Sequence, residues 1–275
     1  MVDLTPKEEE AKKRVCLPLD GINTLEEMEQ LIQSLASYVG VFKIGKGTFT
    51  RFGPEAITLV HKYGGKVFLD LKYHDIPNTV EDAAYAATKL GVYMFNVHAS
   101  GGIKMMKAAK EGVRKAIVQG YYDVEFATPK VIAVTVLTSI DSKILQSEVL
   151  GTERNLIGHV EMLAKNVKKA GLDGIVCSAA DLKRLKNRDK KDKEFPENFM
   201  YVTPGIKGPN GAVGADQKRV FTPGNAVQDG SSLLVVGRAI TDPRTMEEKE
   251  QNLKVTVEMQ QNAAYAVLQD MAKNL

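Results

Sequence analysis

The sequence has 275 residues, of which 44% are hydrophobic and 26% are charged. This length suits one α/β barrel domain, which takes about 250 residues. No apolar run approaches the roughly 18 residues of a membrane-spanning helix, so we expect no contact with a membrane. Lys and Arg number 37 against 34 Asp and Glu. This near balance argues against a nucleic-acid-binding protein, which would carry a strongly basic surface.

The N-terminus and the cysteines indicate the compartment. Residues 1–13 are polar and include three consecutive glutamates. They lack the apolar core of a secretory signal, so we interpret them as an N-terminal extension of a cytoplasmic protein. The two cysteines, Cys16 and Cys177, each lie among apolar residues. We expect buried thiols, not a disulfide or a Cys-rich zinc site.

Short β-rich runs alternate with longer amphipathic stretches along the whole chain. The expected strands are 15–20, 40–45, 66–72, 93–99, 130–137, 173–178, 199–205 and 232–238, and the clearest helices are 24–39, 54–64, 79–91, 102–119 and 153–171. Eight strand-then-helix units predict parallel pairing. A doubly wound open sheet would normally carry a Gly-rich loop after its first strand, and residues 20–23 have none. We therefore predict an α/β fold, a (β/α)8 TIM barrel forming a single domain over 1–275, with its chemistry at the C-terminal strand ends.

Three further segments are assigned from composition. The basic run 182–195 is predicted to be a solvated loop between the sixth and seventh strands. Glycines at three-residue spacing within 205–215 predict a mobile loop after the seventh strand. The final segment, roughly 242–273, is predicted to be one long helix on the outside of the barrel.

Residues 40–46 match the first seven positions of a P-loop, but the context argues against a nucleotide triphosphatase. Gly47 stands where the P-loop needs Ser or Thr. Residues 41–44 also read as a strand, which could not wrap its amides around a phosphate.

Charged residues collect at the predicted ends of the first three strands. Asp70 and Lys72 alternate with Leu71 and therefore share one face of the third strand. Lys43 occupies an interior position of the second strand, and Asp20 follows the first. Such charges are costly to bury without partners. Their coincidence at one rim favours a functional site over a purely structural ion pair.

Later strands end in residues that suit a polar, anionic ligand. His98 ends the fourth strand and is a candidate substrate contact, whereas His61 and His159 fall on predicted helices. Thr138 and Ser139 are expected at the end of the fifth strand, where they either bind a ligand or cap the turn. TIM barrels often bind phosphate through the loops after strands seven and eight, which here begin at Pro204 and at Gly237 and Arg238.

The ordered set of motifs resembles the orotidine 5′-phosphate decarboxylase family, whose activity is the last step of pyrimidine nucleotide synthesis. The matching segments are Leu17-Pro18-Leu19-Asp20, Phe42-Lys43-Ile44-Gly45, Asp70-Leu71-Lys72-Tyr73-His74-Asp75-Ile76-Pro77-Asn78-Thr79, Asn96-Val97-His98-Ala99, Thr135-Val136-Leu137-Thr138-Ser139, Thr203-Pro204-Gly205-Ile206, Asp216-Gln217-Lys218-Arg219 and Val236-Gly237-Arg238. They cover nearly the whole predicted barrel.

The resemblance implies a role for each matching residue. Lys72 would protonate C6 of the pyrimidine, Asp70 would lie beside the leaving carboxylate, and Lys43 and Asp75 would complete a charge network. Asp20 and Lys43 would hold the ribose, and Thr138 or Ser139 would contact the pyrimidine edge. Gln217 and Arg238 would bind the phosphate, and a loop over 205–219 would close over it. Asp75, Ile76 and Thr79 would enter the site of a second subunit, which implies a homodimer. Neither a metal nor a cofactor is implied.

One departure and two rival functions stay open. Lys207 stands where many bacterial members carry arginine, which keeps the charge but loses the forked donor, and its role is left open. The Asp-x-Lys-x-x-Asp core is shared with sugar-phosphate decarboxylases and hexulose-phosphate synthases that use Mg²⁺. The other rival is a non-catalytic nucleotide-binding protein.

Overall fold

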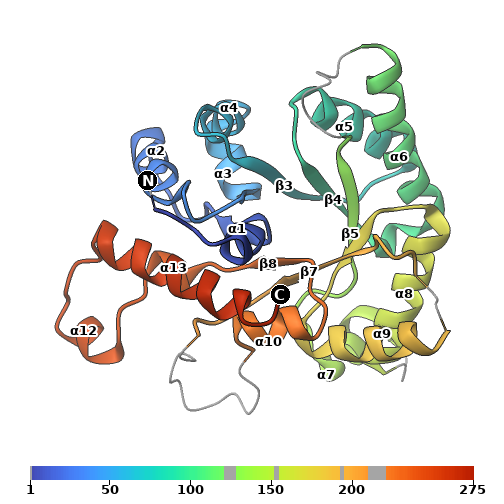
Figure 1. Ribbon diagram of the computed structural model, residues 1–275. Helices are drawn as coiled ribbons and strands as arrows, with labels where there is room; N and C mark the ends of the chain where they lie inside the picture. The colour runs from blue at the N-terminus through green and yellow to red at the C-terminus, as the bar shows by residue number, and fades with distance from the viewer. Residues whose placement is uncertain (1, 121–127, 152–154, 193–194, 210–220) are drawn as a thin grey trace. The chain divides into compact units, whose positions relative to one another are not determined.

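The computed structural model describes residues 2–120, 128–151, 155–192, 195–209 and 221–275. They form two compact units, one comprising Met1–Phe68 and Thr203–Leu275, the other Leu69–Val202. Each unit has its own strands and helices (Figure 1). Buried apolar side chains occur in both units. The predicted single-domain organisation stays a prediction.

The eight predicted strands are all present, in chain order, in a closed barrel. They are β1 (Val15–Pro18), β2 (Val41–Gly45), β3 (Lys66–Tyr73), β4 (Met94–His98), β5 (Lys130–Val134), β6 (Gly174–Val176), β7 (Met200–Pro204) and β8 (Leu233–Val235). The predicted (β/α)8 fold is therefore confirmed. Most strands are shorter than the predicted runs, because those runs include residues of the following loops.

In the first unit, β1 pairs in parallel with both β2 and β8, so that Cys16 lies opposite Val41 and Val235. The helices of this unit are α1 (Pro6–Lys13), α2 (Leu25–Leu35), α3 (Lys46–Phe52), α4 (Glu55–Lys62), α10 (Pro223–Gln228), α11 (Arg238–Thr241), α12 (Met246–Glu250) and α13 (Val257–Ala272). The predicted N-terminal extension contains α1, which starts at a capping box between Thr5 and Glu8 and packs against α13 (Figure 1).

In the second unit, β4, β5, β6 and β7 form a continuous parallel ladder. Its helical segments are α5 (Pro77–Lys89), η1 (Ala99–Gly101), α6 (Gly102–Val118), α7 (Ser142–Ile144), η2 (Leu145–Leu150), α8 (Leu156–Ala170) and α9 (Ala179–Asp192). α5 and α6 pack closely, and Gly112 of α6 makes this possible because it has no side chain. A Cβ at this position would collide with the backbone of α5 at Glu81. The helices predicted in both units correspond to α2, α4, α5, α6 and α8.

The prediction of a loop over 182–195 was wrong, because most of this run belongs to α9. The hydroxyl of Ser178 donates to Asp181 and accepts from its backbone N–H, which fixes the start of the helix. Leu182 and Leu185, three residues apart, are buried. The abundant Lys and Arg residues are good helix formers, and Lys183 and Arg184 are exposed next to the two buried leucines.

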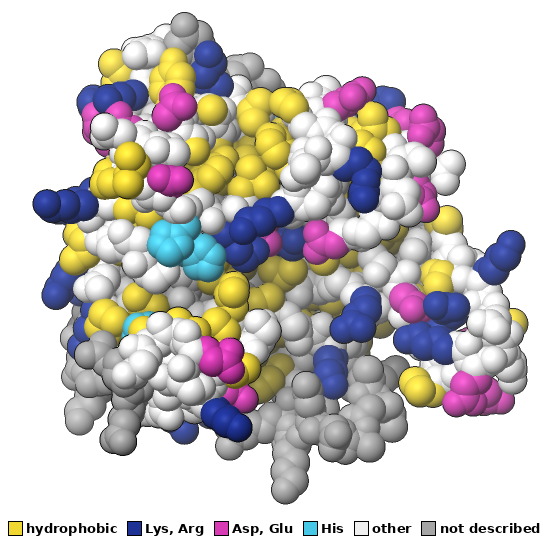
Figure 2. Space-filling view, turned by 180° about the vertical axis from the view of Figure 1, so that it is seen from behind, with side chains coloured by type: hydrophobic (Ala, Val, Ile, Leu, Met, Phe, Trp, Pro, Cys, Tyr) yellow, Lys and Arg dark blue, Asp and Glu magenta, His cyan; other side chains and the backbone are white. Residues whose placement is uncertain are grey.

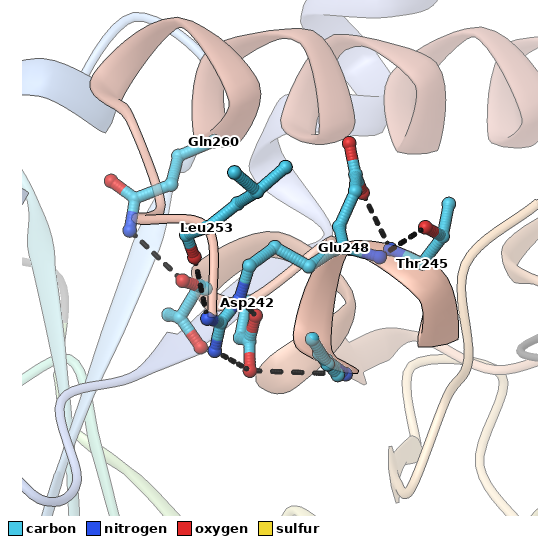
Figure 3. Close-up of polar contacts among 8 residues, drawn as sticks. Asp242, Thr245, Glu248, Leu253 and Gln260 are labelled. Atoms are coloured by element: carbon cyan, nitrogen blue, oxygen red, sulfur yellow. Dashed lines mark hydrogen bonds and ion pairs between the residues drawn. The ribbon is translucent and has the colours of Figure 1, made fainter. Parts of the chain in front are cut away.

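The prediction of one long final helix was also wrong. The segment contains two helices, α12 and α13, separated by residues 251–256, and Thr256 caps the start of α13. Arg244 closes the connecting segment by donating to Asp242 at 2.6 and 3.0 Å and to the carbonyl of Leu253 at 2.7 Å (Figure 3). Gln260 of α13 donates to the carbonyl of Thr241 at 3.0 Å. These bonds fix a connection that helical propensity alone does not predict.

Two other expectations concern burial and the membrane. Cys16 and Cys177 are buried thiols that are not joined in a disulfide, as predicted. Among the residues described, none of the helices is both long and apolar enough to cross a bilayer. The predicted mobile loop 205–219 falls for the most part outside the described residues.

Candidate active site

Asp70 and Lys72 meet at the C-terminal end of β3, as predicted from their alternation. Lys72 Nζ lies 2.6 Å from Asp70 Oδ1. The Asp70 side chain is 11% exposed and that of Lys72 is 25% exposed. Low exposure strengthens this charge-assisted bond relative to one at the surface. An ammonium that carries a proton is thus held beside a carboxylate at a strand end.

Asn96 of β4 joins this pair, a contact that the sequence did not predict. Its amide Nδ2 donates to Asp70 Oδ1 at 2.6 Å, and its Oδ1 accepts the backbone N–H of Lys72 at 2.8 Å. Asn96 is 1% exposed. The sequence did offer one signal for this contact, a polar residue between Phe95 and Val97 in the predicted fourth strand, two positions before His98.

Lys72 has a left-handed backbone conformation, with φ of +53°. A non-glycine residue rarely adopts this conformation, which costs of order 1–3 kcal/mol when strained and persists where the surroundings enforce it. Here the bond from the Lys72 N–H to Asn96 supplies one such constraint. The next residue, Tyr73, packs on Phe95, and burial raises the pKa of Tyr73 to about 12, so its phenol is neutral near pH 7.

In the first unit, Asp20 and Lys43 form a second ion pair. Lys43 Nζ lies 3.1 Å from Asp20 Oδ2 and 3.3 Å from Oδ1. Lys43 is buried in β2, as predicted, whereas the Asp20 side chain is 58% exposed. The exposed carboxylate oxygens can accept hydrogen bonds from a ligand while the lysine holds their position.

The segment that carries Asp20 is held by α3, a helix absent from the prediction. Thr48 donates to the carbonyl of Leu19 at 2.6 Å, and Arg51 donates to that of Ile22 at 2.6 Å. Gly45 leaves room for the ion pair, since a Cβ there would lie 2.7 Å from Asp20 Oδ1. Residues 41–45 are a strand, so the P-loop interpretation is excluded by structure as well as by sequence.

His98 ends β4, as predicted, and its ring centroid lies 5.3 Å from that of His74. Histidine side chains accordingly stand together on the face drawn in Figure 2. His74 belongs to the same β3–α5 connection as Asp75 and Ile76. Asp75 accepts the N–H of Ile76 at 2.7 Å, and Ile76 is 66% exposed. Thr79 is exposed in the first turn of α5.

The remaining predicted residues lie near, but not always at, the expected strand ends. Pro204 ends β7. β5 ends at Val134, so the prediction that Thr138 and Ser139 end this strand was wrong, and both lie in an exposed turn beyond it.

β8 ends at Val235, and Arg238 is the exposed first residue of α11. A Cβ at Gly237 would lie 3.1 Å from Pro18 Cγ, so close packing alone favours glycine there. Gln217 lies outside the described residues.

Comparisons with known proteins agree with this arrangement. Residues 13–251 match the model of the Orotidine 5'-phosphate decarboxylase / HUMPS family. The chain belongs to this family. An orotidine 5'-phosphate decarboxylase from Syntrophus aciditrophicus is 43% identical over 244 residues, which are 89% of this chain and 91% of that protein. One from Shewanella sediminis is 46% identical over 212 residues, or 77% and 83% of the two chains.

A solved structure supports the same assignment. The crystal structure of orotidine 5'-phosphate decarboxylase from Lactobacillus acidophilus has a TM-score of 0.74 and 33% identity, covering 94% of this chain and 98% of that one. The Asp20–Lys43 and Asp70–Lys72 pairs both fall in the part of the chain that matches the orotidine 5′-phosphate decarboxylase family. Across the described ranges, no three His, Cys, Asp or Glu side chains gather as they would to hold a metal ion.

Proposed function

We propose that this enzyme, a carboxy-lyase by its family, converts orotidine 5′-phosphate to UMP and CO₂ in the cytoplasm without a metal or cofactor. Relatives 43% and 46% identical to the chain are named for that activity. The observation that carries the proposal is the ion pair between Asp70 and Lys72, with 2.6 Å between carboxylate oxygen and ammonium nitrogen. It provides a cation with a transferable proton at a strand end of a (β/α)8 barrel, where this fold places its chemistry.

Lys72 meets the main demand of the reaction. When the bond between C6 and the carboxylate breaks, its electron pair stays on C6, and no adjacent carbonyl is positioned to accept it. An ammonium beside C6 stabilises this developing charge. Lys72 then transfers a proton to C6, is left as a neutral amine, and recovers its proton from solvent.

Asp70 contributes too little by repulsion to explain the catalysis. A carboxylate 4 Å from the substrate carboxylate would destabilise it by roughly 4 kcal/mol at an effective dielectric of about 20. Very slow reactions need about 20 kcal/mol of barrier lowering. Most of the effect must come from stabilisation of the transition state around Lys72, so Asp70 mainly orients the ammonium.

The other predicted residues bind the substrate in this proposal. Asp20 and Lys43 hold the ribose hydroxyls, and Thr138 or Ser139 contacts the pyrimidine edge. His98 and Pro204 line the site, while Gly237, Arg238 and Gln217 receive the phosphate under the 205–219 loop. Phosphate binding would drive closure of that loop. No role is assigned to Lys207.

We further propose that the enzyme is a homodimer whose subunits complete each other's sites. Asp75, Ile76 and Thr79 would reach the neighbouring site. Asp75, Ile76 and Thr79 are all exposed, on the β3–α5 connection and the first turn of α5, so a second subunit can reach them.

Turnover of orotidine 5′-phosphate, followed by its ultraviolet absorbance with and without exhaustive chelation, tests the function and its rivals together. We expect the same rate in both conditions, because the proposed chemistry requires only Lys72 and Asp70. A rate lost on chelation and restored by Mg²⁺ would favour a magnesium-dependent sugar-phosphate lyase. Tight binding of UMP without turnover would favour a nucleotide-binding protein.

Arg238→Ala tests the phosphate contact. A charge-assisted hydrogen bond contributes about 1.5–3 kcal/mol, so we expect kcat/KM for orotidine 5′-phosphate to fall about tenfold to a few hundredfold per bond lost. If phosphate binding also drives loop closure, kcat falls as well as affinity. Steady-state kinetics on the nucleotide and on phosphate-free orotidine measure both effects.

The nucleoside is the control for this variant. The wild type should strongly prefer the phosphorylated substrate, and Arg238→Ala should reduce that preference by losing activity on the nucleotide alone. Equal losses on both substrates would show that Arg238 acts elsewhere.

A further inference from the structure

Asn96 contacts both members of the Asp70–Lys72 pair through one side chain. Its two polar atoms lie 2.6 Å from the Asp70 carboxylate and 2.8 Å from the Lys72 backbone nitrogen. All three residues belong to the second unit, on the adjacent segments β3 and β4. At 1% exposure, Asn96 offers these contacts from within the protein and is not open to solvent.

The chemistry of the contacts fixes the orientation of the amide. Only Nδ2 can donate to a carboxylate, and only Oδ1 can accept an N–H, so a flipped amide would lose both bonds. The Asp70 oxygen that accepts from Asn96 is also the one that contacts the Lys72 ammonium. Asn96 therefore sets the position of the carboxylate to which Lys72 is bound.

The second bond acts on the lysine itself. Lys72 has a φ of +53°, a conformation that directs its side chain differently from a regular strand residue. Its N–H, turned away from regular strand geometry, is satisfied by Asn96 Oδ1. Loss of this acceptor would leave a poorly solvated N–H and would favour relaxation toward an ordinary strand conformation.

We propose that Asn96 is a positioning residue for decarboxylation, which holds the Asp70 carboxylate and the strained Lys72 backbone so that the ammonium is aimed at the reacting carbon. The proposal rests on the function proposed above. It assigns Asn96 no contact with substrate. A misplacement of about 1 Å in a catalytic group lowers rates about a hundredfold, so this role predicts a loss in kcat with a smaller change in KM.

Asn96→Asp separates positioning from a merely structural role. The introduced carboxyl keeps an acceptor for the Lys72 N–H but, when ionised, repels Asp70. Two adjacent carboxylates raise the pKa of one of them. Once protonated, the introduced group can again donate to Asp70, which restores the pattern of the amide. We expect kcat relative to wild type to be about a hundredfold lower at pH 8 and to recover at least tenfold at pH 5.5.

Asn96→Ala and Thr88→Val are the comparison variants. Asn96→Ala removes both contacts, so its kcat should fall about a hundredfold at every pH without recovery. Thr88 is equally buried in α5 of the same unit, where its hydroxyl donates to the carbonyl of Ala84 at 2.8 Å. Thr88→Val loses a buried hydrogen bond outside the site, so it should lower the melting temperature while leaving kcat within twofold of wild type.

The outcomes are distinguishable. Folded Asn96 variants with kcat within twofold of wild type, or an Asn96→Asp deficit that does not change with pH, would overturn the positioning role. If Asn96→Ala does not fold, the pH dependence of Asn96→Asp decides alone, and an Asn96→Asp protein that folds at neither pH counts against positioning. A wild type inactive on orotidine 5′-phosphate would instead refute the proposed function.

Discussion

Lys72→Ala is expected to abolish decarboxylation, because it removes both the charge that stabilises C6 and the proton that C6 receives. A positioned acid contributes about 10²–10⁴-fold, and the loss of charge adds to that, so residual turnover should be below about a hundredth of wild type. Single-turnover measurements with excess enzyme give the rate of the chemical step directly.

The protein should fold without the Lys72 side chain. Asp70 retains the hydrogen bond from Asn96 at 2.6 Å after the ammonium is removed. Circular dichroism and the oligomeric state in solution therefore serve as controls, and both should match wild type. A folded Lys72→Ala protein that keeps more than about a hundredth of the turnover would show that another group protonates C6.

Mixed dimers are expected to recover activity from two inactive parents. If Asp75 acts in the partner's site, a hybrid of Asp75→Ala and Lys72→Ala subunits contains one site with both native residues and one with neither. Subunit exchange between differently tagged homodimers, followed by tandem purification, isolates this hybrid. Its kcat per dimer should approach half that of wild type, whereas each parent should be nearly inactive.

The parent homodimers, mixed without exchange, are the control for this experiment. They should show no more activity than the sum of the two alone. A purified hybrid as inactive as its parents would mean that Asp75 serves its own subunit or has no catalytic role.

The fold followed from the sequence where hydrophobic periodicity was strong. Eight β-rich runs predicted every strand, because buried parallel strands are nearly continuous apolar segments. The errors fell where tertiary contacts override local pattern. In the run predicted to be a loop, the buried Leu182 and Leu185 give only a weak apolar signal among many basic residues. The bond from Arg244 to the Leu253 carbonyl joins residues too far apart in the chain for a helical pattern to reveal.

The charged residues of the candidate site could be predicted in the same way, but the polar contacts that hold them could not. Alternation placed Asp70 and Lys72 on one face, and an interior lysine in a strand drew attention to Lys43. Asn96 was missed because an amide carries no charge and no periodic signal, and its importance depends on the left-handed backbone of Lys72. Thr48 was missed because its partner is a carbonyl that becomes available only where β1 ends.

Release of CO₂ from orotidine 5′-phosphate labelled at its carboxylate, with the purified protein in deuterium oxide, tests the central claim most directly. We expect one UMP for each CO₂, with deuterium at C6, at a rate that Lys72→Ala loses. The account would be contradicted if a folded protein that binds UMP left the substrate unchanged, with the label still in its carboxylate.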